Sequence, residues 1–434
     1  MNFSQSSVFN IVASIGLLFV NLFISMIEAR VLGPEEIGRF QVYITTQTYV
    51  STLCALGIGQ SCIYFINRLK VDERKVLATS INASLILALL AGVVLCSIIL
   101  LNRAYFGKEA LVYVCMFSVG TSATLLNNIF TPVLLTRMEV VKSQTVKYST
   151  RILTLVVLVS ILLLGRQLSV GVLICLTGFT SVLASLLLYY YFHKRFSFRD
   201  GIDFPLLGNI TLWGVKLSGN NIASITLSSL PVYFLTWFSV QNGHLNVGFY
   251  SRANSLLVIG TIIASSIGPL LYSKWSGTTD DELKGQVRRM SMLYILINSI
   301  IATGLIISAY ILINIIYGEN FIDAVPVLRI LAITLVANGL KEVCYGILSS
   351  RGYPLLILKN LVWGIIITAV GDYFIIPIYG VNGCAAVTAV ASIMTAFLLM
   401  FDASKVSTVR MADFFVAPTK DEFITIVKQL LHRK

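Results

Sequence analysis

The sequence predicts an all-α integral membrane protein with about twelve transmembrane helices, six in each of two similar halves. An apolar composition and an internal repeat are the observations that predict this class. Of the 434 residues, 56% are hydrophobic and only 12% are charged, whereas a soluble domain has about 25% charged residues. A soluble core of this size cannot bury so much apolar surface, so we expect lipid to surround most of the chain.

About twelve apolar segments approach or exceed the ~20 residues that a membrane-spanning helix needs. They cover roughly residues 7–29, 40–65, 76–101, 110–135, 146–164, 170–192, 212–238, 254–273, 291–316, 326–348, 355–378 and 383–401. The first segment follows no basic cluster and precedes no small-residue cleavage site, so we expect a retained helix rather than a signal peptide. The one sizeable piece expected outside the membrane is the C-terminal tail.

The number of basic residues alternates between high and low from one loop to the next along the chain. The tail and the loops on one side hold 22 of the 32 Lys and Arg residues, and the alternate loops hold 5. Because cytoplasmic loops are enriched in Lys and Arg, we expect both termini in the cytoplasm. The net charge of +12 follows mostly from this asymmetry, and without a basic patch on a separate folded domain we expect no nucleic-acid partner.

A glycine motif occurs twice, at an offset of 210 residues. Residues 33–40 have the spacing Gly-x4-Gly-x-aromatic, and residues 243–250 repeat it. Other landmarks recur in the same order at offsets of about 212 to 214, which turn glycines alone do not explain. Because each half has six spans, both halves are expected to have the same orientation. We predict an N-terminal six-helix bundle over 1–200, a C-terminal six-helix bundle over 201–401 and a cytoplasmic tail over 402–434.

Polar residues form a stripe along the first span. Ser7, Asn10, Ser14, Asn21 and Ser25 are separated by three, four or seven residues, which places them on one helical face. Polar side chains are costly against lipid, so this face should turn toward protein or water. Two interpretations stay open: tight helix packing through small and amide residues, and the lining of a cavity.

The tail contains a predicted amphipathic helix. Thr419 and Glu422 have the spacing of a capping box. Apolar residues then recur at helical spacing through Leu431, with basic residues on both sides. We expect this helix either to lie on the cytoplasmic membrane surface or to dock on the helical bundle.

The chain shows no pattern of a metal site or of nucleotide hydrolysis. The seven cysteines lie in apolar spans without a Cys-x-x-Cys pair, and the three histidines are scattered. Cysteine in such places behaves as a small hydrophobic residue. No Gly-x4-Gly-Lys-[Ser/Thr] loop occurs. We therefore expect a protein that is not an enzyme and has no cofactor.

Four blocks resemble the polysaccharide-export flippases of the multidrug/oligosaccharidyl-lipid/polysaccharide exporter superfamily. They appear in family order at Ala29–Phe40, Val247–Ala253, Ala324–Ala332 and Ile376–Ala386, and the resemblance covers essentially the whole chain. The likeness is to the O-antigen type more than to the drug-exporting type.

The resemblance implies two six-helix bundles around a central cationic cavity in a bacterial cytoplasmic (inner) membrane. It implies alternating access that moves an undecaprenyl-diphosphate-linked oligosaccharide, an O-antigen or other exopolysaccharide repeat unit, from the inner to the outer leaflet. The expected partners are this substrate, membrane lipid, and a polysaccharide polymerase with a chain-length regulator.

A diphosphate in a low-dielectric cavity needs cationic partners, and Arg pairs with two oxygens at once. The basic residues in the spans, at their ends or in the first glycine motif are Arg30, Arg39, Arg151, Lys216, Arg252, Arg329 and Lys341. Of these we predict substrate contacts from Arg30, Arg252 and Lys341, then from Arg39 and Lys216, with Asn10 and Asn21 from the polar stripe. The alternatives are snorkelling to the interface for the arginines and structural pairing for Lys341.

Asp372 is one of few acidic residues inside a predicted span. With amide neighbours such as Asn220 and Asn221 it could bind Na⁺ or carry a proton, which predicts a coupling-ion site. The alternative is a structural ion pair with Arg329, which lies at a similar predicted depth.

Aromatic residues are candidates for stacking on the sugar. They are Tyr43, Tyr49, Tyr64, Tyr233, Trp237 and Tyr345. Most aromatic residues in membrane helices serve packing or interfacial belts instead, so no single one is selected.

Two other functions fit parts of the sequence. A cation-coupled multidrug exporter would have the same fold, but the first glycine block and the expected cationic cavity argue against it. A membrane-embedded glycan polymerase or glycosyltransferase should place reactive residues in a large outer loop. The outer loops here, such as 241–248 and 317–325, are short and carry few reactive groups.

Overall fold

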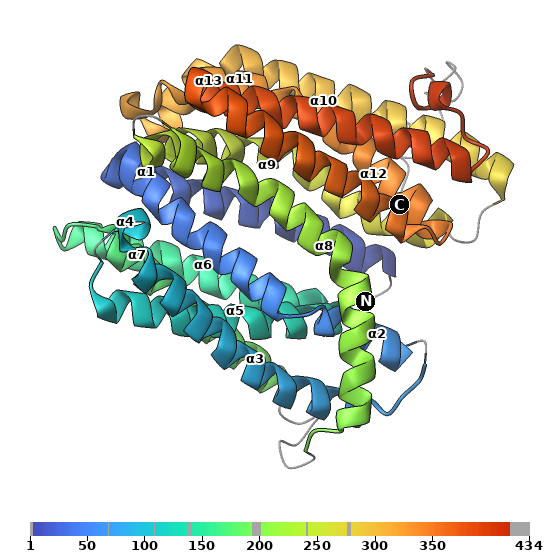
Figure 1. Cartoon of the computed structure of the whole chain (residues 1–434), viewed down its shortest axis with the longest axis horizontal. Coiled ribbons are helices and arrows are strands. Elements are labelled where there is room, and N and C mark those ends of the chain that lie inside the picture. The colour runs from blue at the N-terminus through green and yellow to red at the C-terminus, as the bar shows by residue number, and fades with distance from the viewer. Residues whose placement is uncertain are drawn as a thin grey trace. The chain divides into compact units, whose positions relative to one another are not determined.

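The computed structural model of this chain describes residues 3–67, 69–107, 109–136, 140–192, 201–239, 242–275 and 279–416. Within these ranges every regular element is a helix (Figure 1). The predicted all-α class is therefore confirmed. The predicted amphipathic helix near 419–431 lies outside the described residues.

Helices follow one another in the order that the apolar segments predict. The longer elements of the first part are α1 (Phe3–Cys54), α2 (Ile58–Asn67), α3 (Glu73–Leu101), α5 (Leu111–Thr136), α6 (Val140–Leu163), α7 (Val170–Phe192) and α8 (Phe204–Phe238), with the single turn α4 (Arg103–Phe106) after α3. The later elements are α9 (Gly243–Trp275), α10 (Asp280–Tyr317), η2 (Glu319–Phe321), α11 (Ala324–Ala332), α12 (Thr334–Ser350), α13 (Pro354–Val406) and η3 (Met411–Phe414).

Two helices, α1 and α13, each contain two predicted spans. A glycine breaks the helix between the two spans. α1 has non-helical backbone at Gly33 (φ 77°), just before Pro34, and α13 has it at Gly380 (φ 56°). A positive φ is strained for residues with a Cβ but not for glycine. Counting both arms of each, and joining α2 to α1 and α11 to α12, every predicted span corresponds to a helix.

The outer faces of these helices are apolar. Within the described residues, eight helical segments are long and apolar enough to cross a membrane. Large side chains on them point outward, and Leu89 on α3, for example, is 70% exposed. Such a continuous apolar exterior is stable only against lipid.

Contacts between helices divide the chain into two compact units. The first contains Met1–Arg252 with Ile316–Phe321, and the second contains Ala253–Ile315 with Ile322–Lys434. The division falls later than the predicted boundary after residue 200, since α8 packs against α1, α2 and α3. These units follow packing rather than sequence repeats, so the two six-helix halves stay a prediction.

The first unit is built around α5, which packs between α3 and α7 (Figure 1). An apolar cluster joins Ile24 of α1 with Leu158 of α6 and Leu173 of α7. Together these contacts fix α1, α6 and α7 as walls of one bundle.

The two copies of the glycine motif touch each other within the first unit. A methyl group built on Gly38 would lie 1.7 Å from the carbonyl oxygen of His244, and one built on Gly248 would lie 1.9 Å from that of Pro34. Real Cβ atoms do not approach backbone this closely, so both glycines are needed for α1 and α9 to cross here. The repeated motif therefore makes the contact between a helix of each sequence half.

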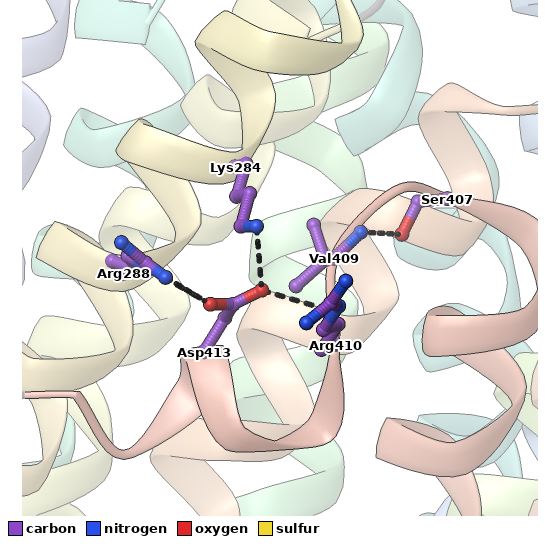
Figure 2. A network of polar contacts seen from close by, with 6 residues as sticks. All are labelled: Lys284, Arg288, Ser407, Val409, Arg410 and Asp413. Atoms are coloured by element: carbon purple, nitrogen blue, oxygen red, sulfur yellow. Dashed lines mark hydrogen bonds and ion pairs between the residues drawn. The ribbon is translucent and has the colours of Figure 1, made fainter.

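In the second unit α12 packs against α13, and the chain after α13 turns back to α10. The buried carboxylate of Asp413 in η3 makes this connection (Figure 2). It accepts hydrogen bonds from the Arg288 guanidinium, with Nε at 2.8 Å, and from the backbone N–H of Arg410 at 2.8 Å, and it lies 3.6 Å from Lys284 Nζ. Burial alone raises the pKa of Asp413, but these bonds and charges outweigh it and hold the pKa below its usual value.

Candidate functional site

A polar cavity of about 750 Å³ lies inside the first unit. Its walls come from both arms of α1 and from α2, α5, α6, α7 and α8. Most of the lining side chains are hydroxyls and amides, including Asn21, Asn127, Thr150, Thr180 and Asn221. Polar residues in membrane helices are costly unless they face protein or water, so this lining is typical of a cavity that holds a polar ligand.

Two cations enter the cavity from one helix. Lys147 and Arg151 are four residues apart on α6 and both line the cavity. At this spacing they lie on the same helical face, about one turn apart. Among the described residues that line the cavity there is no Asp or Glu, so the cavity has a net positive charge that favours an anion.

The acid Glu28 belongs to a buried pair. Its Oε2 accepts a hydrogen bond from Arg252 Nη2 at 3.1 Å, and Glu28 and Arg252 are 8% and 7% exposed. Arg252 also donates to the hydroxyl of Ser25 and lies 5.9 Å over the ring of Tyr317. The Glu28 carboxylate interacts electrostatically with Arg151 as well, so it connects this pair to the cationic wall of the cavity.

The polar stripe of the first span contributes to both the cavity and the buried Glu28–Arg252 pair. Asn21 lines the cavity, which fits the cavity-lining interpretation, and Ser25 accepts a hydrogen bond from Arg252, which fits the packing interpretation. The side chain of Asn10 lies outside the described part of the chain. On α8, Asn221 lines the cavity and Asn220 is not among its lining residues.

The other cations predicted in this unit lie away from the cavity. Arg30 is exposed and its Nε donates to the carbonyl of Ile316 at 3.2 Å, near the end of α10. Arg39 pairs with Glu35 at 2.9 Å and Glu36 at 3.0 Å within its own motif. Lys216 lies 5.6 Å over the ring of Trp213 on the exposed side of α8. Their roles as substrate contacts stay predictions.

Lys341 and Asp372 belong to the second unit. Lys341 Nζ donates to Ser392 Oγ at 3.0 Å, and that hydroxyl donates to Asn338. Asp372 is fully buried on α13, and no hydrogen bond of good geometry reaches its carboxylate from the described residues. The nearby Cys384 thiol is only a weak donor.

The alternative ion pair between Asp372 and Arg329 is not formed, because Arg329 Nε donates to the carbonyl of Ile306 at 3.3 Å instead. The two helices present these side chains to different neighbours. No group of three or more His, Cys, Asp and Glu side chains that could hold a metal occurs in the described residues.

Three residues of this site are not among the substrate contacts that the sequence predicts. They are Lys147, Arg151 and Glu28. A signal for each exists. Glu28 continues the stripe three residues after Ser25, and on α6 the spacing of residues 143, 147, 150, 151 and 154 makes a second polar stripe.

Comparison with known proteins fits this architecture. Residues 5–271 match the family described as polysaccharide biosynthesis protein, which is more than half of the chain. The chain belongs to this family. No curated protein matches it.

Three solved structures of similar fold have low sequence identity to this chain. One is described as lipid II flippase MurJ in an inward closed conformation, with a TM-score of 0.75 and 13% identity over 98% of this chain and 93% of that chain. Two conformations of a multidrug resistance MATE family transporter of the MOP superfamily also match. The inward-facing one has a TM-score of 0.66 and 15% identity over 90% and 95% of the two chains, and the outward-facing one has 0.65 and 16% over 93% and 96%.

These likenesses establish a transporter fold, and with the apolar helices they identify a multi-pass membrane protein.

Proposed function

We propose that this protein is a flippase for a lipid-linked oligosaccharide. Its substrate is an undecaprenyl-diphosphate-linked repeat unit of O-antigen, capsule or another exopolysaccharide. It moves the sugar and the diphosphate from the inner to the outer leaflet of the bacterial inner membrane by alternating access, with both termini in the cytoplasm. A polysaccharide polymerase and a chain-length regulator would act on the product.

The cationic cavity is the observation that carries this proposal. A diphosphate linked at both ends carries a negative charge on each phosphate into the membrane, and Lys147 and Arg151 offer two cations on one face of α6. Charge-assisted hydrogen bonds from these groups are about twice as strong as neutral ones. The surrounding hydroxyls and amides suit the polar head of such a lipid better than its apolar chain. Membership of the polysaccharide biosynthesis family supports the same substrate class.

The Glu28 carboxylate of the buried Glu28–Arg252 pair also interacts electrostatically with Arg151 in the cavity wall. A diphosphate in the cavity would therefore meet an Arg151 guanidinium whose positive charge the Glu28 carboxylate partly offsets.

Ion coupling is proposed at Asp372 in the second unit. A fully buried carboxylate with no good donor is costly to keep charged, and a bound proton or Na⁺ removes that cost. Asn220 and Asn221 belong to the first unit, so their part in an ion site rests on the sequence prediction alone. The remaining predicted substrate contacts, Arg30, Arg252, Lys341, Arg39, Lys216, Asn10 and Asn21, belong to this proposal too.

A multidrug exporter of the same fold is the alternative function. A cationic drug would be repelled by Lys147 and Arg151, and no carboxylate is among the described residues that line the cavity. We therefore place the anionic lipid first.

Binding of undecaprenyl diphosphate without sugar tests the proposal. The purified protein in detergent should bind this lipid, and Lys147→Ala and Arg151→Ala should each weaken binding by about tenfold, as expected for loss of one charge-assisted contact. Lys142→Ala is the matched control, because Lys142 lies on α6 but does not line the cavity. Equal binding by all four proteins would contradict the assignment of this cavity.

A further inference from the structure

A second pocket of the first unit has a different chemistry from the cationic cavity. It encloses about 400 Å³ between the second arm of α1, the α3–α4 turn and α8, which is within the usual size of small-ligand pockets. Its lining is aromatic and hydroxylic, with Tyr49, Asn102, Tyr105, Tyr233 and Trp237 among its side chains. No charged side chain is among the described residues that line it.

Two tyrosines and a tryptophan form a rigid aromatic wall. Tyr233 and Trp237 are stacked on α8 with ring centroids 5.8 Å apart and an angle of 24° between the rings, and Tyr49 meets Tyr233 edge-on at 6.5 Å. Trp237 nevertheless remains 60% exposed. An exposed indole face fixed by a neighbouring ring is available for stacking on a ligand.

Hydrogen bonds hold this wall in position. The Tyr233 hydroxyl donates to Thr46 Oγ1 at 3.1 Å, and the Thr226 hydroxyl donates to Tyr49 Oη at 3.4 Å. At the opposite side, Asn102 Nδ2 donates to the carbonyl of Ile98 at 2.9 Å, which leaves the amide oxygen of Asn102 as an acceptor. The pocket therefore combines flat apolar faces with hydroxyl and amide groups at their edges.

We propose that this pocket binds the sugar part of the substrate by stacking a pyranose ring on Trp237 and Tyr233. A pyranose has an apolar C–H face and a rim of hydroxyls, which matches a ring stack with polar edges. Among the described residues of the pocket, a diphosphate would find no cation and a cationic drug would find no carboxylate. The inference rests on the proposed function, because it assigns the glycan of the same substrate.

The pocket and the cavity are neighbours on opposite sides of one helix. On the second arm of α1, Thr48 and Ser51 line the cavity, whereas Thr46 and Tyr49 line the pocket. On α8 the boundary lies between Ile225 and Thr226. The pocket also includes the helix ends near Asn102 and Trp237, which the distribution of basic residues assigns to the outer side. It is therefore a glycan subsite on the outer side of the diphosphate cavity.

Binding of the separated parts of the substrate tests this assignment. The probes are the oligosaccharide released by mild acid from the lipid-linked donor of the source strain, and undecaprenyl diphosphate without sugar. Calorimetry with the full-length protein in detergent should show about tenfold weaker oligosaccharide binding for Trp237→Ala and Tyr233→Ala, the size of a lost stacking contact. Both variants should bind the diphosphate lipid as the wild type does.

Two further variants keep the result interpretable. Trp237→Phe retains a stacking ring and should recover most of the oligosaccharide affinity. Trp363→Ala removes an exposed tryptophan of α13 that lines neither the pocket nor the cavity, and it should bind both probes normally.

The proposal is overturned if the wild type does not bind the oligosaccharide, or if Trp237→Ala and Tyr233→Ala bind it unchanged. Failure of the proposed function looks different, because then Arg151→Ala would not weaken binding of the diphosphate lipid.

Discussion

At the scale of single residues, charged side chains of the first unit occur in two settings, the wall of the cavity and a buried ion pair. Lys147 and Arg151 face the cavity, whereas Arg252 is held by Glu28 and Ser25 within the protein. A buried ion pair contributes little net stability, but removing one partner leaves an uncompensated charge. The pair should therefore be sensitive to single substitutions and tolerant of a joint one.

Glu28→Gln tests the buried pair. Because Arg252 would lose its counter-charge at 7% exposure, the free energy of unfolding should fall by about 3 kcal/mol. Thermal unfolding in detergent measures this change. The double variant Glu28→Gln/Arg252→Gln should recover part of the loss, and purely additive effects in this double-mutant cycle would show that the two side chains are not coupled.

Asp372→Asn tests the coupling-ion proposal. The amide is nearly isosteric and has no charge to bind a proton or Na⁺, so transport should continue only weakly and should lose its dependence on an imposed gradient. Flux measured with and without the gradient gives the answer. Transport by the variant that depends on the gradient as strongly as that of the wild type would remove Asp372 from the mechanism.

At the scale of elements, close helix crossings depend on glycine. Gly38 on α1 and Gly248 on α9 each lie against backbone of the opposite motif. The sequence repeat predicted that these segments were equivalent, and the structure adds that they touch. The two copies of the motif therefore form one contact within the first unit.

Gly38→Ala and Gly248→Ala should each destabilise this crossing. The added methyl group would lie within 2 Å of a backbone oxygen, so the helices must shift, at a cost of about 2–3 kcal/mol as for other overpacked sites. Folded yield and thermal midpoint provide the measurement. Gly304→Ala is the control, because its methyl group would meet nothing within 4 Å, and an equal loss in this variant would refute the explanation.

Asp413→Asn should release the chain after α13 from α10. The carboxylate accepts charge-assisted bonds from Arg288 while 2% exposed, so its loss should cost about 1–3 kcal/mol at neutral pH. Because its pKa is lower in the folded state, this contribution is present above the unfolded pKa of about 3.9 and is lost as the pH falls through the folded pKa.

Thermal midpoints of the wild type and Asp413→Asn should therefore differ at pH 5–7, and the difference should shrink as the pH falls below about 4. Glu282→Gln, at an exposed position of α10, is the control, and its free energy of unfolding should stay within about 0.5 kcal/mol of that of the wild type. A difference that persists unchanged at pH 3 would exclude the carboxylate as its source.

The sequence allowed the spans to be predicted but not most of the residues that line the cavity. Hydropathy depends on local composition, so every predicted span corresponds to a helix or to one arm of α1 or α13. The cavity depends on how α1, α5, α6, α7 and α8 are rotated against one another, which no single stripe specifies. For the same reason the sequence does not show that Arg252 is buried against Glu28, a residue 224 positions away, and its contact with substrate stays a prediction.

At the scale of the whole molecule, the fold is that of a transporter and the family is that of polysaccharide biosynthesis. The same fold occurs in a lipid flippase and in multidrug transporters, so the architecture alone does not choose the substrate. The choice rests on the side chains of the cavity, whose net positive charge favours a diphosphate over a cationic drug. The central claim is therefore the proposal that the substrate of this protein is a lipid-linked oligosaccharide.

Transport of the lipid-linked oligosaccharide in proteoliposomes tests this claim most directly. The donor would come from the source strain, with a Na⁺ or proton gradient imposed, and its exposure on the far leaflet would be followed with an enzyme that cannot enter the vesicles. We predict movement that depends on the protein and on one gradient, about tenfold slower in Arg151→Ala and unchanged in Lys142→Ala. No movement of this donor, together with gradient-driven efflux of a cationic dye, would contradict the account.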